Sequence, residues 1–272
     1  VHHNGSPQKR SFRKLRAGDV ISVRFLPVDR QPLHVQAEEV ALDIVAEDED
    51  LLVLNKPAGM VVHPSPGHWT GTLVNGVVHY LQSQALPVPV NGTLAQLRPG
   101  VVHRLDIGTS GVIVIAKSAL AFAALSAAFK SRSIRKTYLA VAGGVRSLFR
   151  GFSEPGSGYL IDMPLGRHPS DRLKRAVVPE VAGGRPSQSF VRTLADHSAS
   201  GLSLLEIAPR SGRTHQIRVH LAEMQTPVLG DTTYGWPGKN QRFSQMAQRS
   251  LLHAYRISFP HPRSGEEVTF EA

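Results

Sequence analysis

The chain has 272 residues, of which 41% are hydrophobic, so it is long enough to bury one large core or two modest ones. Its net charge is +10, from 31 lysines and arginines against 21 acidic residues, which favours a polyanionic partner over an ordinary basic surface. There is no cysteine, which excludes disulfides, thiol catalysis and cysteine-ligated zinc, and no apolar run approaches the roughly 18 residues of a membrane-spanning helix.

The amino-terminal segment is polar and basic, and it contains one predicted strand. Residues 15–25 alternate apolar and polar side chains after a Gly-Asp turn. Because a lone strand needs a partner, this segment is expected to be the end of something larger. We therefore divide the chain into residues 1–35, a small domain's remnant or C-terminal end plus a linker, and residues 36–272, the main domain. The chain begins with valine, so a preceding targeting segment is not excluded.

The first half of the main domain contains both predicted strands and predicted helices. Continuous apolar runs indicate buried strands, and the apolar residues Leu73, Val77 and Leu81, at four-residue intervals, indicate an amphipathic helix. The predicted elements are, in order, a strand over residues 51–54 that ends at Pro57, a helix over 72–82, a loop over 84–99, a strand over 112–116 and a helix that Ser118 caps and that runs to about Arg132.

The second half is richer in strands. The predicted elements are a strand over residues 136–141, an irregular excursion over 143–185, strands over 187–194 and 202–208, a short helix that Thr214 caps, a loop over 226–240 and a strand over 250–259. The excursion is rich in glycine, proline and charge, so we expect no core element in it. Many strands with few helices, in no regular alternation, predict an α+β fold with a largely antiparallel sheet.

One carboxylate, Asp106, lies on a short polar turn between apolar segments. Arg104 precedes it, and the sequence Gly108-Thr-Ser-Gly111 follows it. Glycines in such a turn let a ligand approach the backbone closely, and flanking strands hold the turn in place. Spacing alone leaves two interpretations open: Asp106 is an active residue, or it only caps its own turn.

Four motif islands occur along the main domain: Leu54–His63, His103–Gly111, Arg135–Tyr138 and Gly212–His220. The second contains His-Arg-Leu-Asp-x-x-Thr-Ser-Gly, and the fourth, about a hundred residues later, reads Gly-Arg-Thr-His-Gln-Ile-Arg-x-His. Together they resemble the RluA-type RNA pseudouridine synthases of the large-ribosomal-subunit type. The resemblance covers the chain from about residue 40 onward. It implies the pseudouridine synthase fold, a mainly antiparallel mixed sheet flanked by helices and loops with the active-site cleft at its centre.

The reaction that this resemblance implies is the isomerisation of uridine within RNA to pseudouridine. The N1 glycosidic bond breaks, the base turns while it is held, and C5 bonds to the same sugar carbon. Asp106 is the implied catalytic residue, either as a nucleophile at the sugar or as a base that gives a glycal. No redox change or net hydrolysis occurs, so no cofactor is expected. No metal is expected either, because the 13 histidines contain no His-Glu-x-x-His pair.

The resemblance also assigns roles to three other residues. Arg213 matches the arginine that pairs with the catalytic aspartate and opposes its neutralisation. Tyr138 matches the tyrosine that stacks on the target base. Arg104 matches the residue that enters the RNA stack in place of the extruded uridine.

Three further cations, Lys56, Lys136 and Arg135, are candidate substrate-binding residues. Lys56 belongs to an Asn-Lys-Pro motif near the implied site, and a structural role is favoured for it. Lys136 and Arg135 belong to a basic run that is expected to meet RNA phosphates, with a solvated helix end as the alternative. The histidines of the islands are expected to order loops through hydrogen bonds.

The expected partner is structured RNA, with ribosomal RNA favoured and tRNA as the alternative; a monomer is expected, in the cytoplasm, a chloroplast or a mitochondrion. Residues 15–25 resemble the last strand of a small RNA-binding domain, so residues 1–35 are expected to be its remnant or C-terminal end plus a linker. Two other functions stay open. One is a non-catalytic RNA-binding protein, although Asp106, Tyr138 and Arg213 together count against it. The other is a glycoside or nucleoside hydrolase, although most of these need a second carboxylate.

Overall fold

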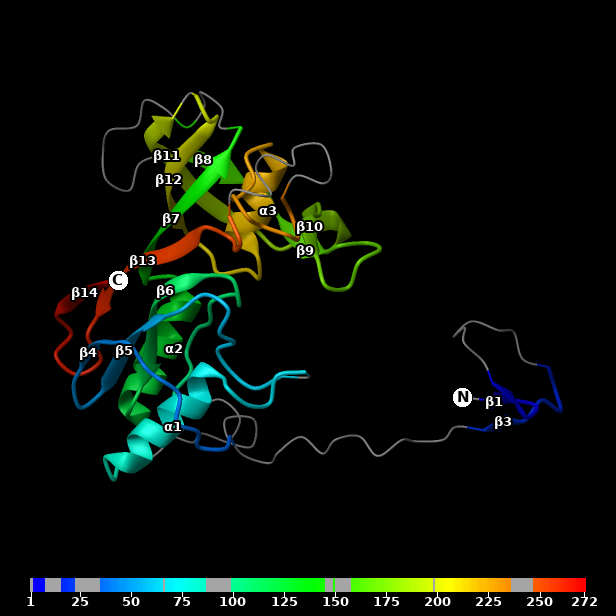
Figure 1. Ribbon diagram of the computed structural model, residues 1–272, viewed down its shortest axis with the longest axis horizontal. Coiled ribbons are helices and arrows are strands. Elements are labelled where there is room, and N and C mark those ends of the chain that lie inside the picture. Colours follow the sequence, from blue (N-terminus) through cyan, green and yellow to red (C-terminus); the bar gives the residue numbers. More distant parts are fainter. Residues whose placement is uncertain are drawn as a thin grey trace. The chain divides into compact units, whose positions relative to one another are not determined.

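The structure, a computed structural model, describes residues 2–7, 16–22, 35–65, 67–86, 99–144, 149, 158–197, 199–235 and 247–272 (Figure 1). The chain forms two compact units, Val1–Leu33 and His34–Ala272. In the first unit, three short strands form an antiparallel sheet in the order β2-β1-β3: β1 (His2–His3), β2 (Ser6–Pro7) and β3 (Ile21–Ser22). Of the strand predicted over residues 15–25, the structure shows residues 21–22, and residues 15 and 23–25 lie outside the described residues.

The second unit is organised around a mixed sheet with nine strands in the described part. The strands are β4 (Ile44–Glu47), β5 (Leu51–Lys56), β6 (Ser110–Ala116), β7 (Arg135–Gly143), β8 (Tyr159–Asp162), β11 (Gln188–His197), β12 (Leu202–Pro209), β13 (Leu252–Pro260) and β14 (Glu267–Glu271). Their order is β4-β5-β6-β13-β7-β12-β11-β8, and β14 pairs with β13. Only the described pair β13–β6 is parallel, which confirms the predicted α+β class with a mainly antiparallel sheet.

Two helices, α1 (Leu73–Ser83) and α2 (Ala119–Ser131), cover opposite faces of one half of the sheet. Alternate residues of β5 separate into two cores, because successive strand side chains point to opposite faces. Leu52 and Leu54 pack with α1, whereas Leu51 and Val53 pack with α2. Both faces of β5 are thus buried, which explains why the strand is a continuous apolar run rather than an alternating one.

The predicted cap of α2 is confirmed, and the end of that helix is unusual. The Ser118 hydroxyl accepts a hydrogen bond from the Ala121 N–H over 3.0 Å. The helix stops at Arg132, whose φ of 62° lies in the left-handed region that glycine usually occupies at a helix end. The chain then enters β7 within three residues, which brings the basic end of α2 beside that strand.

The third helix, α3 (Gln216–Glu223), packs against the other half of the sheet. Its Ile217 and Leu221 join a core with residues of β7, β11 and β12. The prediction that Thr214 caps this helix is wrong, because the N-cap is His215, in the left-handed region with φ of 59° and no side-chain cap bond. The Gln216 side chain instead accepts hydrogen bonds from the Ser211 hydroxyl and from a backbone N–H of the preceding turn.

The expectation of no core element within residues 143–185 is also wrong. Strand β8 pairs with β11 at the edge of the sheet, and its Ile161 is buried in the core. A four-residue strand is too short for its alternation to stand out from a charged segment. The same segment contains a two-stranded hairpin of β9 (Leu165–Arg167) and β10 (Arg175–Val177) and a short 3-10 helix, Glu180–Ala182.

Two other sequence predictions are only partly covered by the described residues. Most of the predicted loop over residues 84–99 and part of the one over 226–240 lie outside them. No helix in the described part of the chain is long and apolar enough to cross a membrane.

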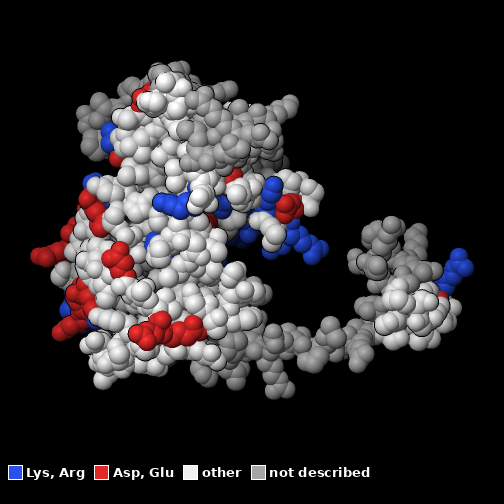
Figure 2. All heavy atoms as spheres, viewed as in Figure 1, with Lys and Arg blue, Asp and Glu red and all other residues white. Residues whose placement is uncertain are grey.

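Charge is distributed unevenly over the surface of this unit. Figure 2 shows acidic side chains gathered on the side that carries β4 and β14, and lysine and arginine around the β9–β10 hairpin. A polyanion is therefore expected to approach from the basic side.

Candidate active site

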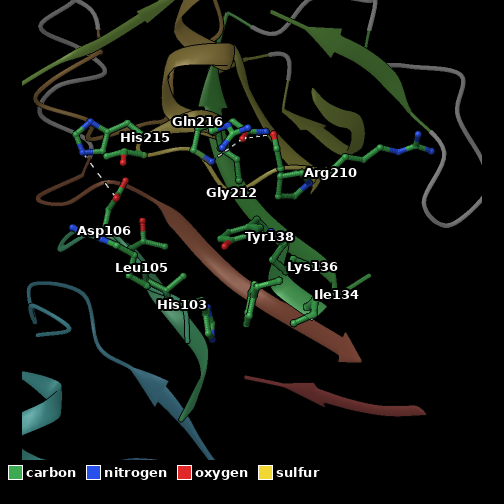
Figure 3. Close-up of a pocket in the computed structure, with 18 of the residues that line it drawn as sticks. His103, Leu105, Asp106, Ile134, Lys136, Tyr138, Arg210, Gly212, His215 and Gln216 are labelled. Atoms are coloured by element: carbon green, nitrogen blue, oxygen red, sulfur yellow. Dashed lines mark hydrogen bonds and ion pairs between the residues drawn. The ribbon is translucent and has the colours of Figure 1, made fainter. Parts of the chain in front are cut away.

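A cavity of about 490 Å³ opens where the two halves of the sheet meet (Figure 3). It is lined by the loop before β6, the end of α2, strand β7 and the turn that leads into α3. Tyr138 of β7 packs against both the core under α1 and the core under α3, so it marks the boundary between the halves. Among the described lining residues there are seven lysines and arginines and one carboxylate, Asp106. The cavity is therefore strongly cationic around a single acid.

Asp106 does not use its carboxylate to close its own turn. The turn closes through the backbone, with the Thr109 N–H donating to the Asp106 carbonyl over 3.0 Å. The carboxylate faces α3 instead: its Oδ2 lies 3.3 Å from Nη1 of Arg218, and its Oδ1 lies 3.9 Å from Nε2 of His215. The interpretation of Asp106 as a simple turn cap is thus not supported, and its side chain is 18% exposed to the cavity.

Lys56 supports the Asp106 turn from beneath. Its side chain is fully buried, and its ammonium donates to the carbonyls of Pro57 at 2.8 Å, Met60 at 2.9 Å and Ile107 at 3.5 Å. Burial lowers the pKa of Lys56 to about 8, although the charge of Asp106 opposes that shift. Its assignment as a substrate-binding residue is wrong, because an ammonium enclosed in this way cannot reach RNA.

We predict that Lys56→Met destabilises the protein by about 2 to 4 kcal/mol, since it leaves buried carbonyls without a donor. Thermal unfolding of the native chain and the variant measures this. Lys130→Met, which removes an exposed lysine, serves as the control. Equal melting temperatures for the native chain and Lys56→Met would contradict the supporting role.

The arginine that contacts Asp106 is Arg218, not Arg213 as expected. Burial lowers the pKa of Arg213, and the positive charges of Arg132 and Arg185 lower it further. The Nε of Arg213 is buried and has no hydrogen-bond partner among the described residues. Arg213 therefore lines the cavity among other cations, and the predicted ion pair with Asp106 is wrong.

A second carboxylate, Asp231, holds Arg218 in place from behind. Nε and Nη2 of Arg218 donate to the two oxygens of Asp231 over 2.6 and 2.8 Å, which fixes the guanidinium plane and leaves Nη1 for Asp106. Burial alone would raise the pKa of Asp231, but the hydrogen bonds and charge of Arg218 outweigh burial and lower it. Asp231 is thus a positioning residue, because it acts on Asp106 only through Arg218.

His215 and Tyr234 complete the contacts around the carboxylate. Nδ1 of His215 lies 2.8 Å from the Tyr234 hydroxyl, which also accepts from the backbone N–H of Arg175 in β10. The Tyr234 ring lies under the guanidinium of Arg218, 5.0 Å from its central carbon. Burial lowers the pKa of His215, with Asp106 opposing the shift. The β9–β10 hairpin is thereby tied to the site.

Tyr138 lies on β7 with its ring in the cavity (Figure 3). Burial raises the pKa of its hydroxyl, and the nearby charge of Asp106 raises it further. The hydroxyl therefore stays protonated at neutral pH. This leaves an apolar face for a flat ligand and a neutral donor at its tip.

The two neighbours Arg135 and Lys136 point to different places, because successive residues of a strand face opposite sides. Lys136 lines the cavity, and burial lowers its pKa to about 8. Arg135 does not line it, and its guanidinium pairs with Glu267 on β14 instead. The structure thus brings Lys136 into the cavity and places Arg135 outside it.

Arg104 lies exposed at the rim of the cavity, beside the Asp106 turn. The preceding His103 is structural. Its Nε2 accepts from the Val114 N–H over 2.8 Å, and its ring stacks on Phe129. Burial, assisted by the charge of Lys136, lowers the pKa of His103 to about 3, so the ring is uncharged. No group of three or more histidine and acidic side chains that could hold a metal ion occurs in the described part.

Comparison with known proteins identifies the family. Residues 50–223, more than half of the chain, match the sequence profile of the RNA pseudouridylate synthases. The chain belongs to this family.

The relatives that this chain resembles include bacterial and plant proteins. It is 41% identical over 266 residues to ribosomal large subunit pseudouridine synthase D of Neisseria meningitidis serogroup A, covering 95% of this chain and 65% of that protein. It is 35% identical over 309 residues to RNA pseudouridine synthase 2, chloroplastic, of Arabidopsis thaliana, covering 98% of this chain and 70% of that protein. The chain thus spans just under two thirds of the Neisseria relative.

A solved structure has the same fold. Human RNA pseudouridylate synthase domain containing 1 superimposes with a TM-score of 0.65 at 25% identity, covering 87% of this chain and 84% of that one. The sheet, its helices and the central cavity described above are therefore those of a pseudouridylate synthase fold.

Sequence reasoning missed three residues of this candidate site: Arg218, Asp231 and Tyr234. One signal for Arg218 was available, because it follows His215 by three residues in the same motif island, and residues three apart share a helix face. No such signal existed for Asp231 and Tyr234, which lie in a segment predicted only as a loop.

Proposed function

We propose that the chain isomerises uridine to pseudouridine in structured RNA, with large-subunit ribosomal RNA as the favoured substrate and tRNA as the alternative. The observation that supports this most is the setting of Asp106. It is the one carboxylate among the described lining residues of a cationic cavity, and Arg218 faces it at 3.3 Å. We expect the protein to act as a monomer and without a cofactor.

The arrangement suits a reaction at a ribose carbon. Asp106 would either attack that carbon or remove a proton beside it, and both routes use the same oxygens. The guanidinium of Arg218 balances the carboxylate charge inside the cavity. The ring of Tyr138 offers a face on which the detached uracil can stay while it turns. Because burial raises its pKa, its hydroxyl stays protonated at neutral pH and can donate a hydrogen bond, while the phenolate that would accept a proton is scarce.

The RNA partner is supported by charge and by relatives. The sequence carries a net charge of +10, and basic side chains surround the cavity. The Neisseria relative is named for the large ribosomal subunit. Arg104, exposed at the rim, is the residue proposed to enter the RNA stack, where a planar guanidinium partly replaces the stacking that an extruded base gives up.

The proposed function does not need the amino-terminal unit for chemistry. We propose that residues 1–35 are the end or remnant of a small RNA-binding domain that adds contacts to RNA. A version of the chain that starts at residue 36 is expected to retain turnover, with weaker RNA affinity.

A hydrolase is not favoured, because the described lining of the cavity holds no second carboxylate that could serve as the acid. Asp231 does not qualify: its side chain has no exposed surface and both its oxygens bind Arg218.

The test is tritium release from RNA labelled with tritium at uridine C5, because replacement of the C5 proton is part of the reaction. Native protein is incubated with total cellular RNA, and the modified uridines are then mapped by comparing RNA from cells with and without the protein. Release with new pseudouridine in large-subunit RNA would support the proposal. An absence of release on every RNA tested, or an assembly defect in the deletion strain with unchanged modification, would overturn it in favour of a non-catalytic RNA-binding protein.

A further inference from the structure

Three cations that line the cavity lie near one another. Lys136 comes from β7, Arg132 from the end of α2 and Arg213 from the turn before α3. Lys136 and Tyr138 are two residues apart on one strand, so they share a face and lie about 7 Å apart along it. Figure 3 shows Tyr138 between Asp106 and Lys136. Lys136 therefore lies farther from Asp106 than Tyr138 does, next to the position proposed for the target base.

This cluster of three cations has no acid of its own among the described residues. The one carboxylate that lines the cavity, Asp106, faces Arg218 and His215. Arg213 lies near Arg132 and Arg185 instead, and their positive charges lower its pKa. Like charges held together without a counter-ion destabilise the folded chain, so such a cluster needs a reason outside the protein itself.

Two of these cations also lack the contacts that a structural role would give them. The Nε of Arg213 is buried with no hydrogen-bond partner in the described part of the chain. Lys136 is largely buried, which lowers its pKa to about 8, yet no described carboxylate pairs with it. Buried donors are normally satisfied, and an unsatisfied one in a cavity indicates a missing partner.

The backbone at Arg132 supports the same conclusion. This residue ends α2 in the left-handed region, where glycine is favoured and a long side chain is strained. Backbone strain of this kind is kept mainly where function requires the residue. The conformation brings an arginine, rather than a bare glycine, to the cavity.

We propose that Lys136, Arg132 and Arg213 form a binding site for a backbone phosphate of the RNA, one nucleotide step from the target uridine. The placement beside that uridine rests on the proposed function. A phosphodiester fits because its two free oxygens accept from the fork of a guanidinium and from an ammonium together. Such a contact carries no sequence information; it sets the register of the strand so that the ribose of the target reaches Asp106.

The experiment measures how RNA affinity depends on salt. A large-subunit ribosomal RNA transcript is titrated with native protein and with Lys136→Met, Arg213→Met and Arg132→Gly over a range of KCl concentrations. Each lost phosphate contact is expected to flatten the slope of log affinity against log salt by about 0.7 to 0.9. Arg132→Gly separates binding from folding, because glycine suits the left-handed position and the variant should melt no lower than native protein.

The matched control is Arg135→Met, which removes the same charge from the position next to Lys136. Arg135 pairs with Glu267 and does not line the cavity, so its loss should leave the slope unchanged. The proposal is overturned if the three cavity variants fold and keep the native slope, or if Arg135→Met flattens it equally.

The pH dependence gives an independent check. Because burial lowers the pKa of Lys136 to about 8, RNA affinity should fall between pH 7 and 9 in native protein. Lys136→Arg should retain affinity at pH 9, since arginine stays charged. A fall of equal size in both would contradict the role of Lys136.

Two further measurements separate this proposal from the proposed function. Tritium release by native protein is recorded on the same transcript. If native protein releases no tritium but the three variants still flatten the salt slope, the phosphate site is supported and the proposed function is not. Once the target is mapped, single neutral methylphosphonate linkages are placed through the substrate. One such linkage beside the target uridine should weaken binding by native protein but cause no further loss of affinity in Lys136→Met. Equal losses of affinity in both proteins at every linkage would overturn the placement.

Discussion

Asp106→Asn is expected to abolish tritium release, with a loss of at least about 10³-fold, while RNA affinity stays within a few-fold of native. Asparagine has nearly the same shape, and the turn closes through backbone atoms, so the fold of the loop should persist. The amide can neither attack the ribose nor accept its proton. Release rates under single turnover and filter binding on the same RNA measure the two effects separately.

The control for Asp106→Asn is Glu223→Gln, an equal exchange of carboxylate for amide at an exposed position on α3. It should leave release and affinity unchanged. Native release from Asp106→Asn would rule out a catalytic role for the carboxylate. A tenfold or greater loss of affinity with a lower melting temperature would indicate that Asp106 is structural.

Arg218→Met is expected to damage stability and turnover together. It removes three donated hydrogen bonds and leaves the carboxylate of Asp231, which has no exposed surface, without a cation. Breaking a buried pair from one side costs about 3 to 5 kcal/mol. At roughly 2 to 4 °C per kcal/mol for a unit of this size, the melting temperature should fall by about 6 to 20 °C.

The double variant Arg218→Met with Asp231→Met separates the two effects. Replacing both partners of a buried pair by apolar residues restores much of the stability. Turnover should not recover, because Asp106 still lacks its cation. Recovery of turnover in the double variant would show that Arg218 acts only through the fold.

Arg213→Met, compared with Arg218→Met, tests which of the two arginines pairs with Asp106. Removing Arg213 relieves repulsion by Arg132 and Arg185, so the melting temperature should not fall. RNA affinity should decrease, as expected for a phosphate contact. Loss of stability in Arg213→Met, with Arg218→Met unaffected, would restore the sequence-based assignment.

The secondary structure around the site follows closely from local patterns. The strand over residues 112–116 and the Ser118 cap were predicted because apolar runs and caps depend on neighbours in the chain. Successive residues of a strand point to opposite faces, so Lys136 shares a face with Tyr138 and Arg135 does not. Applied to that strand, this alternation would have excluded Arg135 from the site.

The sequence by itself determined the family resemblance, the basic balance and the position of Asp106 on a turn before a buried strand. It also placed Lys136 and Tyr138 on one predicted strand, over residues 136–141. Only the tertiary structure decided which arginine reaches Asp106. Arg218 lies on α3, and packing of that helix against the sheet brings its Nη1 to 3.3 Å from the carboxylate.

The burial of Lys56 and the support that Asp231 gives to Arg218 were likewise decided by packing. The physical reason is the same in each case. Local patterns record contacts between residues a few positions apart, whereas an active site is assembled by segments more than a hundred residues apart. The relative rotation of those segments is determined only when their cores pack.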